Sequence, residues 1–273
     1  MAQRKVKGYG WIPDIPDNRD MPFTAPLAIE LLPSSVDLTK TKRFPDIYNQ
    51  GNLGSCTGMA IAGAIEYDLL QQNLPDIIPS ALFIYYNERM IEGTVESDSG
   101  AMIRDGIKSV NQIGFCSEEC WPYDISKFAV SPSQKCYDEA VKDRALRYRK
   151  VTQTLAQMKT CLASGKPFVF GFPVFESIEA REVFEAGNIP LPQIGERVIA
   201  GHAVMAVGYD DARQVFLIRN SWGEKWGAKG YGTMPYAYLT DLASDIWVID
   251  AVTVPMTGAA RAAEMRELVS TAS

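Results

Sequence analysis

Cys56 stands where a glycine-rich segment gives way to an apolar run. Three glycines fall within the eight residues 51–58, and since each costs about 1 kcal/mol inside a helix relative to alanine, they predict a turn. After Cys56 the apolar residues recur at spacings of three and four, which predicts a helix. The positive end of a helix dipole and its unpaired N–H groups favour thiolate over thiol. Cys56 is therefore a candidate nucleophile, although a small buried cysteine at a tight turn fits the same pattern.

The chain contains one histidine, His202, at the start of an apolar stretch that predicts a strand. Eighteen residues later, Asn220 ends a second strand-like run that begins at residue 215. Two neighbouring strands can place an imidazole and an amide side by side. A thiol, a base and a group that orients the base are what nucleophilic catalysis requires. The alternative for a histidine in an apolar strand is an ordinary core position.

The order of Gln50, Cys56, His202 and Asn220, with the glutamine six residues before the cysteine, resembles the papain family of cysteine peptidases. The resemblance covers roughly residues 32–255 and, by the length of the N-terminal arm, is nearest to a bacterial branch with a short prosegment. The segments that carry it are Leu32–Asp37, Trp121–Tyr123, Gly165–Val169 and, most specifically, Asn220–Gly223 followed by Trp226-Gly227 and Gly230-Tyr231.

The resemblance implies an α+β, papain-like fold, with a helical left lobe that carries Cys56 and a β-barrel right lobe that carries His202 and Asn220. The substrate cleft lies between the lobes. Cys56 would act as a thiolate paired with protonated His202, which later protonates the leaving amine. Asn220 would fix the imidazole tautomer, and Gln50 with the N–H of Cys56 would form the oxyanion hole.

The resemblance also suggests where substrate binds. The candidate substrate-binding residues are mostly small or apolar. Such a site favours a substrate with an apolar side chain one position before the scissile residue, although ordinary core packing explains the same residue types. Trp222 is expected to shield the bond between His202 and Asn220 from water. A single histidine excludes a two-histidine occluding loop, so we expect an endopeptidase acting on peptides or proteins. The candidate substrate-binding residues are Gly100, Met102, Ala200, Gly201, Ala203 and Trp222.

The sequence departs from the family around the nucleophile. Leu53 stands where the family signature has its first cysteine, and Thr57 where it has an aromatic residue. Residues 97–100, Ser-Asp-Ser-Gly, lack the partner cysteine as well. The usual disulfide is therefore absent, and we expect packing to hold the loop. Two alternatives stay open: an inactive papain-like binding module, and another Cys-His amidase or acyl transferase.

Residues 1–31 form an N-terminal arm with four prolines, which disfavour helix. A disordered tail is one interpretation. Trp11, Ile12 and Ile15 are more apolar than such tails usually are, so we expect the arm to dock. The resemblance implies an inhibitory prosegment that lies along the cleft, acting as an intramolecular inhibitor. The expected domains are the arm over 1–31, a mainly helical lobe over 32–140, a mainly β lobe over 141–256 and a tail over 257–273.

Composition limits the partners. A net charge of −6 and a pI near 5.0 argue against nucleic acid, which needs a basic surface. No apolar run approaches the roughly 18 residues of a membrane helix, and no secretory signal is visible, so the compartment is undetermined. We expect a monomer without cofactors or metal. Either a reduced state of all five cysteines or two pairs plus one thiol is consistent, and Cys116, Cys120 and Cys136 lack a free histidine to complete a zinc site.

Periodicity places helices before strands, which is typical of an α+β protein in two halves. Ser80 and either Thr152 or Thr154 are expected to cap helices, and the segment 116–134 is expected to be irregular. The expected helices span 56–72, about 80–86, 101–112, 151–163 and 176–184. The expected strands span 167–172, a stretch from His202, 215–218, 231–234 and 246–249.

Overall fold

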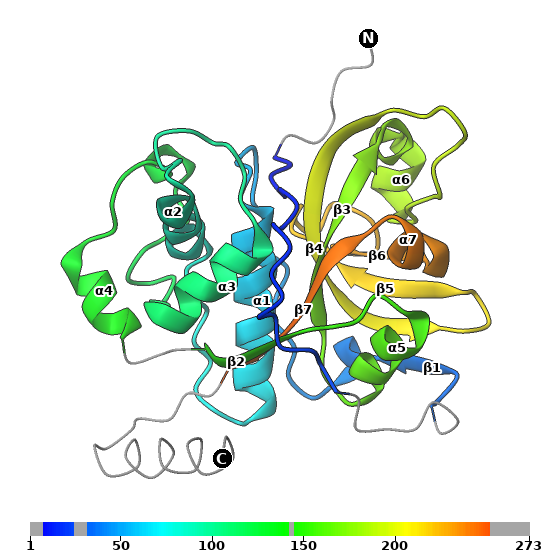
Figure 1. Ribbon diagram of the computed structural model, residues 1–273, viewed down its shortest axis with the longest axis horizontal. Coiled ribbons are helices and arrows are strands. Elements are labelled where there is room, and N and C mark those ends of the chain that lie inside the picture. Colours follow the sequence, from blue (N-terminus) through cyan, green and yellow to red (C-terminus); the bar gives the residue numbers. More distant parts are fainter. Residues whose placement is uncertain (1–7, 25–31, 142–144, 252–273) are drawn as a thin grey trace.

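The computed structural model describes residues 8–24, 32–141 and 145–251. Helices fill one side of the molecule and a sheet fills the other (Figure 1). Ser80 caps α2 by accepting a hydrogen bond from the Phe83 N–H, and Gly93, with φ of 72°, ends it. The helices on the first side are α1 (Cys56–Gln71), α2 (Ala81–Glu92), α3 (Ile103–Gln112) and α4 (Gln134–Ala140), with the short 3-10 turn η3 (Ile125–Lys127) before α4.

The sheet has seven strands, and every pairing in it is antiparallel. The path runs β2-β7-β3-β4-β5-β6, and β1 pairs with β4, the long central strand. Its members are β1 (Ser35–Asp37), β2 (Ala145–Lys150), β3 (Phe168–Phe175), β4 (Val198–Asp210), β5 (Val215–Arg219), β6 (Tyr231–Pro235) and β7 (Ser244–Ala251). The short helices around it are η2 (Leu38–Lys40), α5 (Leu155–Ala163), η4 (Glu176–Glu179), α6 (Arg181–Ala186) and α7 (Tyr236–Asp241).

Helix α1 lies between the other helices and the sheet. It is buried on nearly every side, because α2 and α3 pack on one flank and β4 and β7 on the other. Its apolar residues form one core with β4 residues such as Ala203 and Met205, while β3 supplies Phe168, Phe170 and Phe172 to a second core within the sheet. The N-terminus of α1 thus faces the sheet from the helical side.

Most of the predicted elements are present, with shifted ends. The helix from Cys56 ends one residue earlier than expected, and α2 is longer than expected. Thr154 caps α5, which starts at Leu155 rather than at residue 151. The predicted helix over 176–184 is two pieces, η4 and α6, separated by Ala180. The strands β1 and β2 and the helices α4 and α7 were not predicted, because they are short or carry no clear period.

The predicted α+β class is confirmed by this arrangement of helices and sheet. The division of the chain at residue 140 stays a prediction. The predicted tail over 257–273 and parts of the arm, 1–7 and 25–31, lie outside the described residues. Among the helices that are described, none is long and apolar enough to cross a membrane.

Candidate active site

The loop before α1 is held without a disulfide. Leu53 is buried against Leu82 and Tyr85, as the packing prediction expected. In addition, the Asp98 carboxylate accepts the Gly54 N–H at 3.0 Å and the Tyr85 hydroxyl at 2.6 Å. Asp98 lies in the segment that lacks the partner cysteine. Hydrogen bonds to a carboxylate therefore add to packing where the family has a covalent link.

Gln50 is oriented from both ends. Its Oε1 accepts the Ser221 hydroxyl at 2.6 Å, so its Nε2 must point the other way, toward the Leu53 carbonyl at 2.9 Å. The Tyr123 hydroxyl donates to the Gln50 carbonyl oxygen at 3.0 Å. Sequence reasoning did not assign Ser221 or Tyr123 these roles, although both lie in segments that carried the resemblance.

His202 and Asn220 come together across β4 and β5. The distance from His202 Nε2 to Asn220 Oδ1 is 2.9 Å. The same oxygen accepts the Ser221 backbone N–H at 2.8 Å, which identifies it as oxygen and makes Nε2 the donor. The neutral imidazole then carries its lone pair on Nδ1, which is buried and has no hydrogen-bond partner among the described residues. His202 is the fifth residue of β4 and not its start, because the strand extends back to Val198 through its pairing with β3.

Aromatic rings enclose the imidazole. The Trp222 ring stacks on it at 4.6 Å between centroids with an angle of 24°, and the Phe172 ring meets it edge-on at 5.6 Å. The hydrogen bond between His202 and Asn220 is therefore covered on the Trp222 side.

Cys56 begins α1, as predicted. The backbone amides of Ala203, Gly10 and Thr57 lie close to its sulfur. Since Ala203 follows His202, this contact brings the thiol to the strand that carries the imidazole. Both side chains are completely buried.

In this state, burial opposes the expected thiolate–imidazolium pair. Burial raises the pKa of the Cys56 thiol to about 12, and burial lowers the pKa of His202 to about 4. Both groups are neutral near pH 7, because low-dielectric surroundings disfavour each charge. The nearby Glu88 carboxyl also acts against a thiolate at Cys56. In this state the N-terminal arm covers the site.

The arm enters between the helices and the sheet (dark blue in Figure 1). The Gly8 carbonyl oxygen accepts a hydrogen bond from Gln50 Nε2 at 2.6 Å. On the helical side, the Gly10 carbonyl accepts the Ala101 N–H at 2.7 Å; on the sheet side, the Trp11 N–H donates to the Gly201 carbonyl at 3.1 Å. The arm thus bridges both walls next to Cys56.

Tyr9 and Trp11 fill the space beside the site. The Tyr9 ring contacts His202 and Trp222 edge-on, at 5.7 and 5.6 Å between centroids. The Trp11 ring lies where a side chain at Gly171 or Gly201 would stand, so these two glycines make room for it. Trp11 docks as predicted, whereas Ile15 is 67% exposed, so the expectation that Ile15 helps to dock the arm is wrong.

The predicted substrate-binding residues are not equally placed. Gly100, with φ of 78°, lies against the backbone of Gly10, and Gly201 and Trp222 contact the arm as described. The Met102 N–H donates to the Glu92 carboxylate at 2.7 Å, at the start of α3. Ala203 is completely buried, and Ala200 pairs with Val174 in the sheet.

Beyond the site, charged side chains hold the arm. Asp14 Oδ2 accepts the Trp247 Nε1–H at 2.9 Å, and Asp245 Oδ2 accepts both the Trp11 Nε1–H at 3.1 Å and the Asp14 N–H at 2.8 Å. Asp20 forms ion pairs with Arg104 at 2.6 Å and with Lys150 at 3.3 Å. Sequence reasoning missed these anchors.

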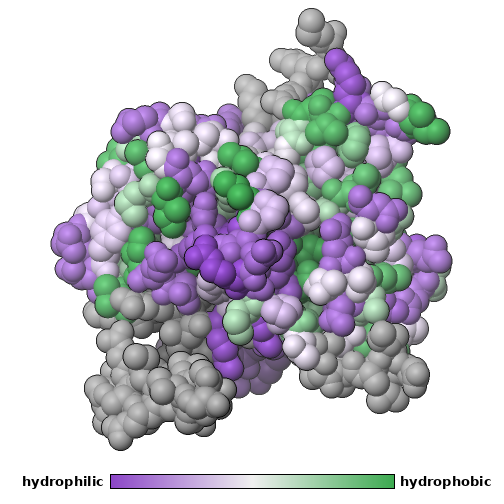
Figure 2. All heavy atoms as spheres, viewed as in Figure 1, coloured by the Kyte–Doolittle hydropathy of each residue, from purple (hydrophilic) through white to green (hydrophobic). Residues whose placement is uncertain are grey.

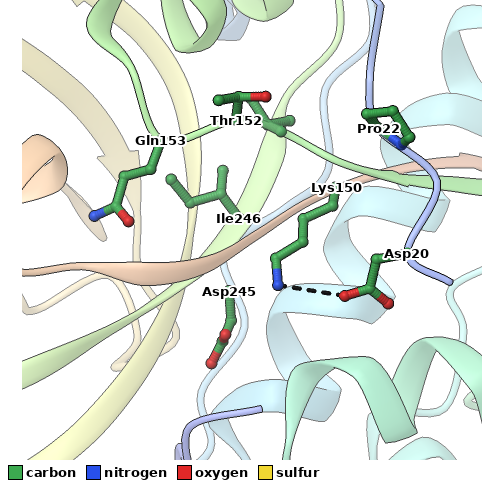
Figure 3. A pocket seen from close by; sticks show the side chains of 8 residues that line it. Asp20, Pro22, Lys150, Thr152, Gln153, Asp245 and Ile246 are labelled. Carbon is green, nitrogen blue, oxygen red and sulfur yellow. Dashed lines mark hydrogen bonds and ion pairs between the residues drawn. The ribbon is translucent and has the colours of Figure 1, made fainter. Parts of the chain in front are cut away.

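A cavity of about 200 Å³ lies where the arm passes β2 and β7. Figure 3 shows the ion pair between Lys150 and Asp20 at its edge, with Asp245 on β7 nearby. Phe23 follows and is buried in the sheet core, and its N–H donates to the Lys150 carbonyl at 2.8 Å. Hydrophilic side chains gather at the centre of the face in Figure 2, over the place where the arm crosses in Figure 1.

A family model described as "Papain family cysteine protease" matches residues 32–243, more than half of the chain. The chain belongs to the papain family. It is a cysteine peptidase with the papain-like fold, as predicted. The match begins after residues 1–31.

This papain-family protease is similar to known proteins over nearly its full length. It is 40% identical over 276 residues to an uncharacterized peptidase C1-like protein of Acanthamoeba polyphaga mimivirus, covering 92% of this chain and 89% of the relative. Xylellain, a cysteine protease from Xylella fastidiosa, has a TM-score of 0.85 and 45% identity, covering 92% of this chain and 99% of xylellain. The procathepsin B S9 of Trypanosoma congolense shares the fold at 17% identity, with a TM-score of 0.72 over 92% of this chain and 88% of its own.

Proposed function

We propose that this protease cleaves peptide bonds with Cys56, His202, Asn220 and Gln50, and that its N-terminal arm inhibits it. The proposal rests on one observation above the others: Gln50 Nε2 donates to a peptide carbonyl of the chain itself, the Gly8 oxygen, at 2.6 Å. An amide fixed in this direction by Ser221 is suited to stabilise the oxyanion of a substrate carbonyl. The arm would occupy that position until it leaves.

In the proposed reaction, His202 Nδ1 takes the proton of the Cys56 thiol, and the sulfur attacks the substrate carbonyl carbon. The oxyanion receives hydrogen bonds from Gln50 Nε2. His202 then gives its proton to the leaving amine, which leaves a thioester on Cys56. Water, deprotonated by His202, hydrolyses the thioester. Asn220 keeps Nε2 protonated throughout, so that Nδ1 stays the basic nitrogen.

The arm would inhibit in two ways. It covers both walls of the site through Gly10, Ala101, Trp11 and Gly201, which excludes a substrate chain. It also excludes water, and the buried thiol and imidazole then remain neutral. Release of the arm would admit water and favour the charged, reactive pair. The proform structures among the related folds support such an arrangement.

For specificity, we propose an apolar side chain one position before the scissile residue. Gly100, Met102, Ala200, Gly201, Ala203 and Trp222 stay the proposed substrate contacts. Two of the arm's own residues at this site, Tyr9 and Trp11, are large and aromatic, which supports an apolar preference.

The test is hydrolysis of a fluorogenic dipeptide amide under reducing conditions. Full-length protein, protein lacking residues 1–31 and the Cys56→Ala variant of each are compared, with circular dichroism as the check on folding. We expect activity to rise on truncation and to vanish in Cys56→Ala. Equal activity with and without the arm would refute inhibition and keep the peptidase. A folded, truncated protein that is inert would refute the catalytic assignment and favour a binding module.

A further inference from the structure

Three cysteines outside the active site meet on the helical side. Cys116 and Cys120 lie in the segment after α3, and Cys136 lies on α4. Their sulfur atoms all lie within 4.8 Å of one another, and the Cys120 and Cys136 sulfurs are 3.1 Å apart. Cys116 and Cys136 are completely buried, next to Phe83 and Tyr137. Three sulfur atoms from two segments thus share one small volume.

A carboxylate lies beside the group. Glu139 lies one helical turn after Cys136, which places both side chains on the same face of α4. Its carboxylate lies near the Cys120 thiol, outside the set of three sulfur atoms that lie within 4.8 Å of one another. It is oriented by Ser117, whose N–H and hydroxyl donate to Oε1 at 2.8 and 2.6 Å. A ligand oxygen held by neighbouring donors is typical of metal sites.

We propose that Cys116, Cys120, Cys136 and Glu139 bind one Zn²⁺ ion in a closed, structural site. Zinc prefers four tetrahedral ligands with sulfur at about 2.3 Å, which places neighbouring sulfurs about 3.8 Å apart. The Cys120 and Cys136 sulfurs need to separate by less than about 1 Å to reach that distance. A disulfide would use two of the three sulfurs, whereas a zinc ion uses all three and the carboxylate.

Zinc binding releases protons and involves no change of oxidation state. Thiolate rather than thiol is the metal ligand, so each cysteine that binds the ion gives up its proton. The three protons pass to the solvent. The loaded site, with three thiolates and one carboxylate, has the same net charge as the common four-cysteine zinc site. No oxidant is required.

The zinc site would stabilise the loop that carries Gln50, the proposed oxyanion-hole residue. Cys116 and Cys120 begin the segment that continues to Tyr123, whose hydroxyl donates to the Gln50 carbonyl. The same segment is tied to the start of α2 by Ser80, which donates through its N–H to the Cys116 carbonyl at 2.8 Å and through its hydroxyl to the Trp121 carbonyl at 2.6 Å. Zinc would link this segment to α4, in a loop region that lacks the family's disulfide.

The test uses the full chain with Cys56→Ala, so that the proposed nucleophile cannot bind metal. Protein purified under reducing conditions is loaded with zinc, dialysed, and its metal content is measured. Cobalt replaces zinc in a parallel sample to reveal thiolate-to-cobalt absorption. We expect about one ion per chain, a higher Tm with the ion than after chelation, and loss of both signals in Cys136→Ser. Cys161→Ser, a buried cysteine in α5, is the matched control and should keep them.

Zinc binding by the Cys56→Ala parent protein tests the site whether or not Cys136→Ser folds. Reduced, folded parent protein that binds no zinc would overturn the site, as would equal binding by folded Cys136→Ser. An alternative outcome is that the protein purified without reductant is about 2 Da lighter and carries a Cys120–Cys136 bond. If that protein also takes up no zinc after reduction, the cluster is a disulfide site and not a zinc site. Glu139→Gln should weaken zinc binding roughly tenfold or more, and unchanged affinity would remove the carboxylate from the site.

Discussion

The arm meets the rest of the molecule in two different ways. Residues 8–12 contact the proposed active site mainly through backbone groups, with Gly10 pressed against Gly54 and Gly100. Residues 14–23 are held by side chains, among them the buried Asp14 and the ion-paired Asp20. The first stretch can block because glycine lets two backbones approach closely. The second stretch can hold because its charges and its aromatic ring are matched to partners.

This difference predicts that two functions of the arm can be separated by mutation: blocking of the active site and attachment of the arm to the protein. A change in residues 8–12 should alter what covers Cys56, whereas a change in residues 14–23 should alter how long the arm stays.

The largest effect is expected for Gly10→Ala. A methyl group at this position would stand 1.7 Å from the Gly54 carbonyl oxygen, which no small shift relieves. We expect the activity of the full-length protein to rise by about 100-fold, toward that of protein lacking residues 1–31. Peptide hydrolysis measures it, and Pro13→Ala, at an exposed position of the same arm, is the control. Unchanged activity would show that residues 8–12 do not block.

A smaller effect is expected for Asp20→Asn. The change leaves the buried Arg104 guanidinium and the Lys150 ammonium without their shared carboxylate. Loss of such a charged contact costs about 2 kcal/mol, so hydrogen exchange of the arm should become roughly 30-fold faster. Asp17→Asn breaks the exposed pair with Arg19 and should change little. Equal effects of the two variants would contradict an anchoring role for Asp20.

The arm should dock more strongly at lower pH, because Asp14 titrates. Burial and the neighbouring Asp245 carboxylate raise the pKa of Asp14 to about 6, from its ordinary 3.8. The docked arm therefore binds a proton more readily than the released arm, and docking weakens as pH rises from about 4 through 6. Between pH 5 and pH 7 the expected loss is about 1.3 kcal/mol, or roughly tenfold.

Hydrogen-exchange protection factors of the arm, corrected for the intrinsic effect of pH, measure this change in the Cys56→Ala protein. Asp14→Asn cannot titrate and should lose most of the pH dependence in this window. Protection that instead increases between pH 5 and pH 7 in the parent protein would contradict the assignment to Asp14.

The smallest effect is expected for Ser221→Ala, which concerns the wall that residues 8–12 cover. It removes the hydrogen bond that turns the Gln50 amide toward the Gly8 carbonyl. One such bond is worth about 1 kcal/mol, so kcat/KM of the protein lacking residues 1–31 should fall about fivefold. Ser126→Ala, at an exposed position, is the control. An unaltered kcat/KM would mean that Leu53 alone orients the amide.

Several features could be predicted from the sequence because they depend on local order. The glycines before Cys56 and the apolar spacing after it place the thiol at the start of a helix, where the structure has it. The segment around Asn220 carried the family resemblance, which the family match confirms. Composition and element order were enough for the α+β class. Helix and strand ends were less certain, since β4 extends four residues before His202 through pairing with β3.

What the tertiary structure decided depends on contacts between distant residues. Nothing near Asp14 in the sequence indicates that it forms hydrogen bonds with Asp245 and Trp247 on β7, more than 230 residues away. Burial raises the pKa of Cys56 and lowers the pKa of His202, and burial is not a property of the residue itself. The three cysteines, two in the loop after α3 and one on α4, come together only because α4 packs beside that loop. Local pattern gives the identity and the class, whereas the electrostatic state of the site is set by what the fold packs around it.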